Sequence, residues 1–486
     1  MRPPLQVLGV ILFVTVVRSV LTAQLELTSV ESYLWLCAQR PALGYYDYPG
    51  MIAWMGWLST TLFGHSPLGV RAVTILSGGA MVWFVFLAAR RLYDERIARL
   101  AAFLAALVPD FLVFAAYATP DAPCLLFWSA TVWALAHALS GGPPRWWYLA
   151  GLFLGLAMDS KYHAVFLGLG VFGFLLASPE QRSWLKRKEP WLAVGVALVA
   201  FSPTILWNAR NGWQSFAYQG VSRFKESGFE PRELWEYPVS QLLLLTPAIA
   251  AWAWAAGFRT LGRWRSSDWR DRFLTALSMP MLIFFFLVIF SRPVRGHWPV
   301  PAYVTGLILS AAAVARGGTL GRRLHVGSLA ALAVAYFLAP LVLQIAIPSE
   351  KRSGWAFLAA EVGKRKPDFV ICHEYHHASQ MAYLMRPVEA WEMTPVGKPS
   401  KNFPNWWTPE PYRGRNAVFV AEARKLDAAL PRIVESFDRV GPPEPVSVPR
   451  VDFPGREKKK RDYVILRAWG YRGPKSVEPR PPPVDD

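Results

Sequence analysis

The chain has 486 residues, of which 53% are hydrophobic, and its formal net charge is +18. This length and apolar content exclude a small disulfide-rich module and favour a membrane protein. The three cysteines, Cys37, Cys124 and Cys372, form neither a disulfide framework nor a CxxC metal pair. Most of the positive charge flanks apolar segments and no basic stripe is found, so nucleic-acid binding is not expected.

Long apolar segments recur from Pro4 to Ile347, and most approach the roughly 20 residues that cross a bilayer as a helix. The uninterrupted segments are Val7–Leu25, Val70–Ala89, Ile97–Ala116, Ala122–Leu139, Trp191–Trp207, Val239–Phe258, Phe273–Phe290, Val300–Val314 and Val326–Ile347. The region Trp146–Ala177 is broken by the polar run 159–163 and is interpreted as two short spans. The sequence therefore predicts an all-α polytopic domain over residues 1–347 with about eleven transmembrane helices.

Basic residues are shared unequally between the alternate breaks in this pattern. One set of breaks carries 18 Lys and Arg residues, and the opposite set carries 9. The positive-inside rule places the richer set and the N-terminus in the cytoplasm. Residues 26–66 are then an outer juxtamembrane loop, and the tail after Pro348 also lies outside. The first apolar segment is interpreted as an uncleaved anchor.

The tail after residue 347 has a different character. Strands are predicted at Phe369–Cys372, Ala417–Val420 and Tyr463–Leu466, and helices at Ala378–Met385 and Leu430–Phe437. Short strands separated by helices predict a small extracytoplasmic α/β domain over residues 348–475. Pro-rich and charged pieces such as Gly441–Pro445 and Arg456–Asp462 are expected to form loops, and residues 476–486 a disordered tail.

Ionisable side chains gather in the segments predicted to lie at the outer face. They are Glu31, Asp47, Asp121, Asp159, Lys161, His163, Arg292, Arg295 and His297. Ionisable residues at span ends are costly to bury and often mark a functional path. Snorkelling or helix capping explains any one of them equally well, but their position at one face favours a shared function.

Carboxylates and cations at a membrane surface suit sugar transfer from a polyprenyl-phosphate donor. A carboxylate can deprotonate the acceptor hydroxyl as a general base. The leaving group is a lipid phosphate, whose developing charge needs a cation such as Lys, Arg or a metal ion. Lys161 and Arg295 are the candidate cations.

Several stretches of sequence match one known superfamily in the same order. They are ESYLWLCAQRPALGYYDYPGMIAW, FGHSPLGVRAVTILSG, AARRLYDERIARLAA, YATPDAPCLLFW, RWWYLAGLFLGLAMDSKYHAVFL, LWNARNGWQSF and GHWPVPAY, with looser matches at HEYHHASQMAYL and NFPNWW. The chain resembles the bacterial branch of the dolichyl-phosphate-mannose protein mannosyltransferase-like superfamily. This branch includes the aminoarabinose–lipid A transferases and the lipopolysaccharide-core galacturonosyltransferases.

The resemblance implies a GT-C fold in the bacterial inner membrane. It also implies an inverting glycosyltransferase that uses a polyprenyl-phosphate sugar. The implied acceptor is a hydroxyl of lipid A, core oligosaccharide, another glycan or a protein on the periplasmic side.

The resemblance further implies roles for single residues. Lys161 matches a family lysine and is expected to bind the donor phosphate, together with Arg295. Asp121, in the TPDAP motif, is expected to bind substrate or orient a cation, and a divalent metal at this residue is left open. Tyr46 and His297 are expected to contact substrate, although an interfacial belt formed by Trp298 and Tyr303 is an equal alternative around His297.

Two positions depart from the family pattern. The usual Asp-Glu pair reads Val30-Glu31 here, and the later DHPP-like turn reads Asp47-Tyr48-Pro49-Gly50. The family's first aspartate is therefore replaced, so either Asp47 or Glu31 is expected to be the catalytic base.

Two other functional classes are alternatives to the transferase. A lipid or sugar transporter or flippase would place polar groups near mid-bilayer, often in paired broken helices. A membrane zinc metalloprotease would use H-E-x-x-H through His373, Glu374 and His377, which requires one helix carrying both histidines. A strand-like run leads directly into His373, so the first histidine is expected to precede the helix.

Overall fold

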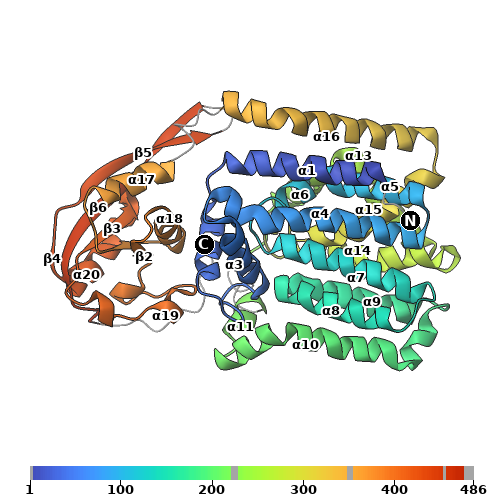
Figure 1. Cartoon of the computed structure of the whole chain (residues 1–486), viewed down its shortest axis with the longest axis horizontal. Coiled ribbons are helices and arrows are strands. Elements are labelled where there is room, and N and C mark those ends of the chain that lie inside the picture. The colour runs from blue at the N-terminus through green and yellow to red at the C-terminus, as the bar shows by residue number, and fades with distance from the viewer. Residues whose placement is uncertain (1–3, 221–227, 347–353, 453–455, 476–486) are drawn as a thin grey trace. The chain divides into compact units, whose positions relative to one another are not determined.

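The computed structural model describes residues 4–220, 228–346, 354–452 and 456–475 (Figure 1). The chain divides into two compact units. Unit 1 comprises Met1–Thr22, Tyr48–Asn211 and Ser227–Leu338, and unit 2 comprises Ala23–Asp47, Gly212–Glu226 and Ala339–Asp486. The last segment of unit 2 begins close to the predicted boundary at residue 347, but two earlier segments join it. The predicted outer loop 26–66 is therefore divided between the two units directly after Asp47. The predicted disordered tail, residues 476–486, lies outside the described residues.

Unit 1 is built from helices. They are α1 (Leu5–Ala23), α3 (Met51–Phe63), α4 (Pro67–Leu92), α5 (Glu95–Leu107), α6 (Pro109–Phe114), α7 (Asp121–Leu139), α8 (Arg145–Ser160), α9 (Val165–Ala177), α10 (Lys188–Arg210), α12 (Glu233–Leu245), α13 (Pro247–Gly262), α14 (Trp269–Val288), α15 (Tyr303–Arg316) and α16 (Thr319–Ala346), whose last residues belong to unit 2. Each of the eleven predicted apolar segments corresponds to one of these helices or to a consecutive pair.

Not all of these helices are long enough to cross a bilayer by themselves. Within the described ranges, six are sufficiently long and apolar: α1, α4, α7, α10, α14 and α16. The count reaches seven if α12 and α13, bent by 106° at the intervening break, form one span. The remaining predicted spans correspond to shorter helices, including the apolar α9 and α15. The polytopic membrane domain is confirmed, whereas the length criterion supports fewer full spans than the eleven predicted.

Small residues let the helices of unit 1 pack closely. Gly151 and Gly155 lie one turn apart on α8, and a Cβ at these positions would come within 2.2 Å of the Ala193 carbonyl oxygen and 2.4 Å of the Ala197 carbonyl oxygen in α10. Such small-residue contacts are typical of helices that associate within a bilayer, where close backbone packing replaces the hydrophobic effect.

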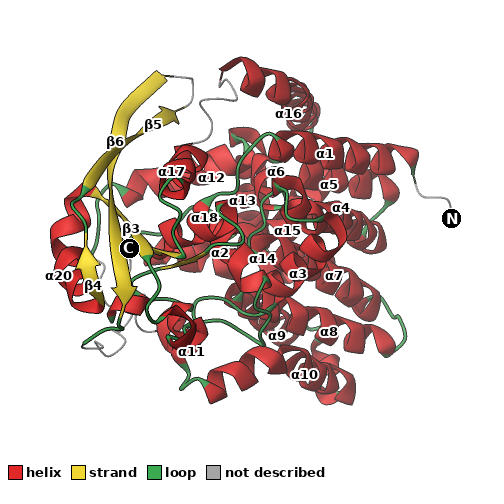
Figure 2. Cartoon of the chain, turned by 60° about the vertical axis from the view of Figure 1, so that its left-hand side comes forward, coloured by secondary structure: helices red, strands yellow, loops and turns green. Residues whose placement is uncertain are grey.

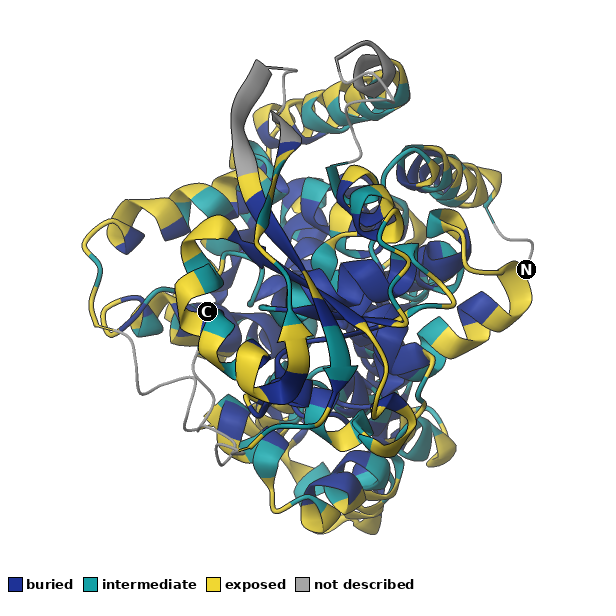
Figure 3. Cartoon of the chain, turned by 90° about the vertical axis from the view of Figure 1, so that its left-hand side faces the viewer, coloured by how far each residue is buried: buried dark blue, intermediate teal, exposed yellow. Residues whose placement is uncertain are grey.

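Large apolar side chains cover the outward-facing surfaces of the long helices. Leu12 of α1 is 66% exposed, Val199 of α10 is 73% exposed and Phe337 of α16 is 72% exposed. Figure 3 shows buried and exposed stretches alternating along the peripheral helices. Exposed apolar faces of this size are typical of surfaces in contact with lipid.

Unit 2 contains a mixed sheet with helices around it (Figure 2). Its helices are α2 (Ser29–Ala38), α11 (Gln214–Gly220), α17 (Gly354–Gly363), α18 (Tyr375–Leu384), α19 (Phe403–Trp406) and α20 (Leu426–Ser436), and its strands are β1 (Phe369–Cys372), β2 (Glu389–Trp391), β3 (Ala417–Glu422), β4 (Phe437–Val440), β5 (Glu444–Asp452) and β6 (Arg456–Tyr471). The strand order is β2-β1-β3-β6-β4, with β5 also paired to β6. Strands β2, β1 and β3 are parallel, and β6 is antiparallel to its three neighbours. The predicted α/β domain is confirmed.

One charged segment of the tail was assigned wrongly from the sequence. Arg456–Asp462 was expected to be a loop, but it forms the first part of β6 and pairs with β5, for example Lys458 with Arg450. Pro445, also expected in a loop, pairs with Val464. Strand β3 pairs with β6 only from Tyr463 onward. The earlier part is a two-stranded ribbon, which does not require the apolar alternation of a core strand.

Candidate functional site

Asp121 and Lys161 form an ion pair in unit 1. Asp121 is the first residue of α7, and Lys161 follows the last residue of α8, which packs against α7. Lys161 Nζ lies 2.7 Å from Asp121 Oδ1, and the two side chains are only 13% and 7% exposed. Each charge neutralises the other at a place where a lone charge would be costly. Two of the predicted site residues are thus brought together.

A second carboxylate, which was not among the predicted site residues, lies beside this pair. Asp110 in α6 is fully buried, and neither of its oxygens has a hydrogen-bond partner among the described residues. It interacts electrostatically with Asp121 and Lys161. The buried Arg18 fixes α6, because its Nε and Nη2 donate to the last carbonyl groups of that helix at 3.2 and 2.9 Å. The sequence signal was an aspartate in an otherwise apolar stretch.

These residues do not fit a divalent metal ion. Asp121 Oδ1 already accepts a hydrogen bond from the Lys161 ammonium. Within the described ranges, no group of three or more His, Cys, Asp or Glu side chains is placed to share a metal ion. Lys161 is the cation that lies directly against Asp121, and no step is assigned to a metal.

The polar break after α8 is fixed by a neighbouring helix. Asp159 is buried, and its Oδ1 accepts a hydrogen bond from Thr204 Oγ1 of α10 at 2.5 Å. Lys161 then leaves the helix in an extended conformation, with φ −154° and ψ 127°. Asp159 thus anchors the end of α8 and thereby helps to position Lys161.

Aromatic contacts surround the predicted residues His163 and His297. The His163 ring stacks on Phe285 at 5.4 Å and lies 6.2 Å from the Trp298 ring. The His297 ring stacks on Phe114 of α6 at 5.0 Å. These contacts bring the 295–298 loop, the break after α8 and the end of α6 into one region of unit 1.

The 295–298 loop is also fixed from the bundle interior. Tyr303 is fully buried and its hydroxyl donates to Gln241 Oε1 at 2.8 Å, while Gln241 Nε2 donates to the Gly296 carbonyl at 2.9 Å. Tyr303 therefore cannot belong to an interfacial belt. Arg295, by contrast, is exposed, and its guanidinium forms no hydrogen bond or ion pair within the described part of the chain. It remains available to an anion.

In unit 2, Asp47 belongs to a buried polar cluster. Asp47 is 5% exposed, and its Oδ1 accepts a hydrogen bond from the Tyr33 hydroxyl at 2.9 Å and a longer one from Asn402 Nδ2 at 3.4 Å. The Asn402 amide also donates to the Tyr33 hydroxyl at 2.5 Å. Burial, and then the neighbouring Asp47 carboxylate, raise the pKa of Tyr33 well above its usual value. The phenol therefore keeps its proton and donates it to Asp47.

The backbone around Asp47 is fixed by residues from distant parts of unit 2. The Tyr46 N–H donates to Asn402 Oδ1 at 2.9 Å, and Gln219 Nε2 donates to the Asp47 carbonyl at 2.7 Å. The Tyr46 ring lies 5.2 Å from the Tyr218 ring, whose hydroxyl accepts from Lys401 Nζ at 3.3 Å. Lys401 and Asn402 were missed as site residues, although the second lies within the NFPNWW match.

Glu31 has a structural role in unit 2. It is fully buried at the third position of α2, where its Oε2 accepts from the Thr28 N–H at 2.9 Å and its own N–H donates to Thr28 Oγ1 at 3.2 Å. These reciprocal bonds form a capping box. One of the two candidate bases is thus engaged at a helix start, which favours Asp47 for the catalytic role.

The histidines of the H-E-x-x-H match lie around the start of α18. The His373 N–H donates to the Val420 carbonyl at 3.0 Å and extends the β1–β3 pairing, whereas α18 begins only at Tyr375. The prediction that His373 precedes the helix is confirmed. His373 and His377 therefore do not share a helix face, as the zinc protease motif requires.

Comparisons with known proteins agree with this architecture. A profile of the dolichyl-phosphate-mannose-protein mannosyltransferase family matches residues 47–207. The lipid A galacturonosyltransferase RgtD of Rhizobium johnstonii is 27% identical over 283 residues, which cover 58% of this chain and 59% of that protein. An undecaprenyl phosphate-α-4-amino-4-deoxy-L-arabinose arabinosyl transferase of Pseudomonas aeruginosa is 28% identical over 313 residues, covering 61% and 54%. The chain spans just over half the length of these relatives.

The fold matches over nearly the whole chain. The crystal structure of ArnT from Cupriavidus metallidurans in the apo state has a TM-score of 0.66 at 15% identity, covering 94% of this chain and 97% of that one. The chain therefore has the GT-C fold. The structure of ArnT bound to undecaprenyl phosphate gives a TM-score of 0.63 at 14% identity, with the same coverage. Of the predicted site residues in this GT-C chain, Asp47, Asp121 and Lys161 lie in the profile match, while Glu31 and Arg295 lie outside it.

Proposed function

We propose that this GT-C protein transfers a sugar from a polyprenyl-phosphate donor to a hydroxyl group of lipid A, core oligosaccharide, another envelope glycan or a protein. The names of its relatives support this proposal, since one acts on lipid A and the other is named for an undecaprenyl-phosphate sugar. So does the similar fold of ArnT bound to undecaprenyl phosphate. The main support is the shielded Asp121–Lys161 pair, a fixed cation among apolar helices, which suits a phosphate attached to a lipid chain.

In this proposal Lys161 binds the donor phosphate. An ammonium group has three N–H donors, and Asp121 accepts one of them. Two donors remain for phosphate oxygens, and charge-assisted hydrogen bonds of this kind are stronger than neutral ones. Asp121 acts as a positioning residue that holds the ammonium in place. Arg295 supplies a second, more exposed cation for the same anion.

Asp47 is the proposed base. Its carboxylate takes the proton from the acceptor hydroxyl as the acceptor oxygen forms a bond to the anomeric carbon of the sugar. The bond between that carbon and the phosphate oxygen breaks, and the phosphate leaves with the electron pair. Attack opposite the leaving group inverts the configuration at the anomeric carbon. Lys161 stabilises the charge that develops on the departing phosphate.

We infer that the protein resides in the bacterial inner membrane with its N-terminus in the cytoplasm. The unequal counts of 18 and 9 basic residues in alternate segments support this orientation. Asp121, Lys161, Arg295 and His297 then lie toward the periplasm, where a lipid-linked donor would be presented.

The experiment compares binding and transfer in the same preparations. Purified wild type, Lys161→Gln and the exposed-lysine control Lys364→Gln are titrated with undecaprenyl phosphate. Loss of a charged hydrogen-bond donor is expected to weaken binding at least tenfold in Lys161→Gln only. Transfer of the sugar from donor to lipid A is then followed in vesicles that contain lipid A. One set of vesicles receives the undecaprenyl-phosphate donor of galacturonic acid, and a second set receives that of 4-amino-4-deoxy-arabinose.

The expected result is consumption of one donor by wild type and Lys364→Gln but not by Lys161→Gln. Equal undecaprenyl phosphate binding by Lys161→Gln and wild type would overturn the assignment of Lys161. If wild type moved the intact donor across the vesicle membrane without consuming it, the protein would be a transporter.

A further inference from the structure

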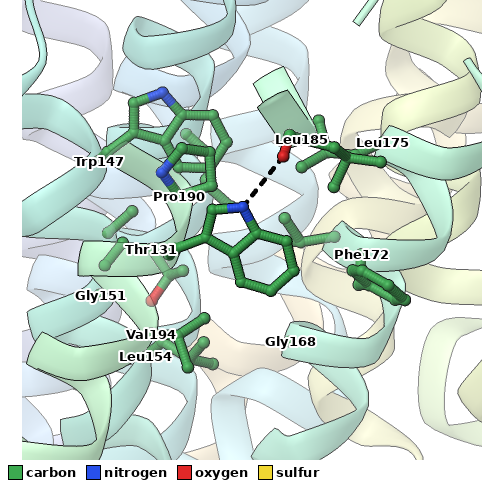
Figure 4. Close-up of a pocket in the computed structure, with 15 residues that line it drawn as sticks. Thr131, Trp147, Gly151, Leu154, Gly168, Phe172, Leu175, Leu185, Pro190 and Val194 are labelled. Carbon is green, nitrogen blue, oxygen red and sulfur yellow. Dashed lines mark hydrogen bonds between the residues drawn. The ribbon is translucent and has the colours of Figure 1, made fainter. Parts of the chain in front are cut away.

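An apolar cavity of about 100 Å³ lies in unit 1 (Figure 4). Its walls come from α7, α8, α9, α10 and the 3-10 helix Arg182–Lys186. It contacts the second half of α7, at Thr131 and Leu135, and the first ten residues of α8, from Trp147 to Leu154. Asp121 begins α7 and Lys161 follows α8. The cavity is therefore at the opposite ends of these helices from the candidate phosphate site.

The cavity opens toward the apolar surface of the helices. Three of its lining residues, Phe172, Trp191 and Val194, are 45%, 54% and 51% exposed. The Trp191 indole N–H donates to the Leu185 carbonyl at 3.0 Å, the bond drawn in Figure 4, and this fixes the 3-10 helix beside the opening. A hydrocarbon chain can enter such a cavity directly from the bilayer.

Basic residues are close in sequence to lining residues at one end of the cavity. Lys186 and Lys188 lie in the chain between the lining residues Leu185 and Pro190, and Arg145 lies two residues before Trp147. All three cations are exposed, and their side chains form no hydrogen bond or ion pair within the described ranges.

The acidic residues on this side are already paired. Glu189 accepts from Arg187 Nη2 at 2.8 Å, and Glu180 accepts from Arg272 Nη2 at 2.5 Å. The net charge next to the cavity is therefore positive and available to an anion.

We propose that this cavity is a binding site for an anionic phospholipid. One acyl chain occupies the cavity, and Lys186 and Lys188 bind the headgroup phosphate. A volume of about 100 Å³ corresponds to about three water molecules at roughly 30 Å³ each. It therefore holds part of a chain, and the rest lies along the exposed apolar faces of α9 and α10. Basic clusters beside transmembrane helices favour anionic lipids.

The first experiment tests whether the lysines beside the cavity give the protein a preference for an anionic lipid. Purified protein is titrated with palmitoyl-oleoyl phosphatidylglycerol or phosphatidylcholine, and the first bound lipid is counted by native mass spectrometry. Wild type is expected to bind the anionic lipid at least tenfold more tightly, since each lysine contributes about fivefold. Lys186→Gln/Lys188→Gln removes this preference, whereas the exposed pair Arg322→Gln/Arg323→Gln on α16 keeps it.

Gly168→Leu tests the cavity itself. A Cβ at Gly168 meets only Leu154 Cδ2, at an ordinary 3.5 Å, so a larger side chain extends into the cavity. The matched control is Gly173→Leu on the same helix, where a Cβ meets nothing within 4 Å. Gly168→Leu is expected to weaken binding of both lipids at least fivefold, and Gly173→Leu to leave binding unchanged.

A second measurement applies even if a variant fails to fold. Wild type is photo-cross-linked with phosphatidylglycerol that carries a diazirine in its acyl chain, and adducts are expected in residues 147–154, 168–175 and 185–194. Equal affinity of wild type for the two lipids, unchanged binding by Gly168→Leu, or adducts confined to other segments would each overturn the proposal. The outcome is independent of sugar transfer, because no residue of the proposed phosphate site is altered.

Discussion

The buried carboxylate of Asp121 in unit 1 and those of Asp47 and Glu392 in unit 2 accept hydrogen bonds from different kinds of donor. In unit 1, the shielded ammonium of Lys161 meets the carboxylate of Asp121, an opposite charge. Within unit 2, Asp47 accepts from the Tyr33 hydroxyl and the Asn402 amide, and Glu392 accepts from the main-chain N–H groups of Thr394 and Ser400; these donors are neutral. A charge paired with its opposite is sensitive to the removal of either partner, whereas a carboxylate held by several neutral donors loses only part of its support at each substitution.

This difference matches the proposed chemistry. A phosphate carries its own negative charge, so it can share the Lys161 ammonium with Asp121 without leaving a charge uncompensated. A base must accept a proton and release it again, and neutral donors can hold Asp47 in place through both states. The two arrangements can therefore be tested separately.

The largest expected effect follows from Asp47→Asn. This change keeps the shape of the side chain but removes the carboxylate that accepts the proton, so turnover is expected to fall about 100-fold to 10,000-fold. Binding of undecaprenyl phosphate is expected to stay within about twofold, because that site is assigned to Lys161 in unit 1. Turnover and binding are measured on the same purified preparation.

Glu31→Gln is the matched control for Asp47→Asn. It keeps a side-chain oxygen that accepts from the Thr28 N–H in the capping box of α2, so it is expected to cost less than about 1 kcal/mol of stability, with turnover nearly unchanged. The reverse pattern, in which Glu31→Gln loses turnover and Asp47→Asn keeps it, would move the base to Glu31.

A second, smaller effect is expected from breaking the ion pair of unit 1. Asp121→Asn leaves the Lys161 ammonium shielded without its counter-charge, which is expected to lower the free energy of unfolding by about 3 kcal/mol. The double variant Asp121→Asn/Lys161→Gln is expected to regain most of this stability, because neither charge remains. Unfolding in detergent provides the double-mutant cycle.

An exposed ion pair supplies the control for this cycle. Arg99 and Glu95 lie one turn from each other on α5. Arg99 Nη1 is 3.9 Å from Glu95 Oε1, and the two side chains are 39% and 56% exposed. Glu95→Gln is expected to change stability by less than about 0.5 kcal/mol. A coupling energy near zero between Asp121 and Lys161 would show that their pairing has no energetic importance.

Most of unit 1 could be predicted from its sequence because apolar length is a strong local signal. Each of the predicted apolar segments contains a helix or a consecutive pair. The 106° bend between α12 and α13 was missed, because Val239–Phe258 is apolar throughout. Pro247, at the start of α13, was the available sequence signal, and in the structure the preceding Thr246 has a positive φ of 74°. Hydropathy shows that a segment is apolar but not whether its helix bends.

The site could be predicted only where a pattern is local. Asp121 and Lys161 each end a helix within a recognisable motif, and their pairing follows from the contact between α7 and α8. Tyr33, Asp47 and Asn402 form a cluster across more than 350 residues of chain, which no local pattern encodes. In unit 2, β2 was missed because it has three residues, and the β5–β6 ribbon because a two-stranded segment needs no apolar alternation.

A third expected effect, similar in size to that of breaking the ion pair, concerns pH and unit 2. Glu392 is 2% exposed and accepts hydrogen bonds from Thr394 and Ser400. Burial raises the pKa of Glu392 to about 7, against a model-compound value of 4.5, despite these bonds. The folded state therefore retains a proton that the unfolded chain releases above about pH 4.5. Its contribution to stability is complete below that pH and is lost as the pH rises to about 7.

The expected loss of stability across this interval is about 3 kcal/mol. It can be followed in the full chain by hydrogen exchange of the β1 and β3 amides, which report on the opening of unit 2. Glu392→Gln is expected to remove this pH dependence, because an amide does not titrate, and Glu410→Gln at an exposed position to leave it intact. If the β1 and β3 amides of wild type become more protected between pH 5 and 7, the Glu392 carboxylate is stabilised by its neutral donors more than it is destabilised by burial. Unit 2 would then stabilise a buried carboxylate as effectively as the counter-charge does in unit 1.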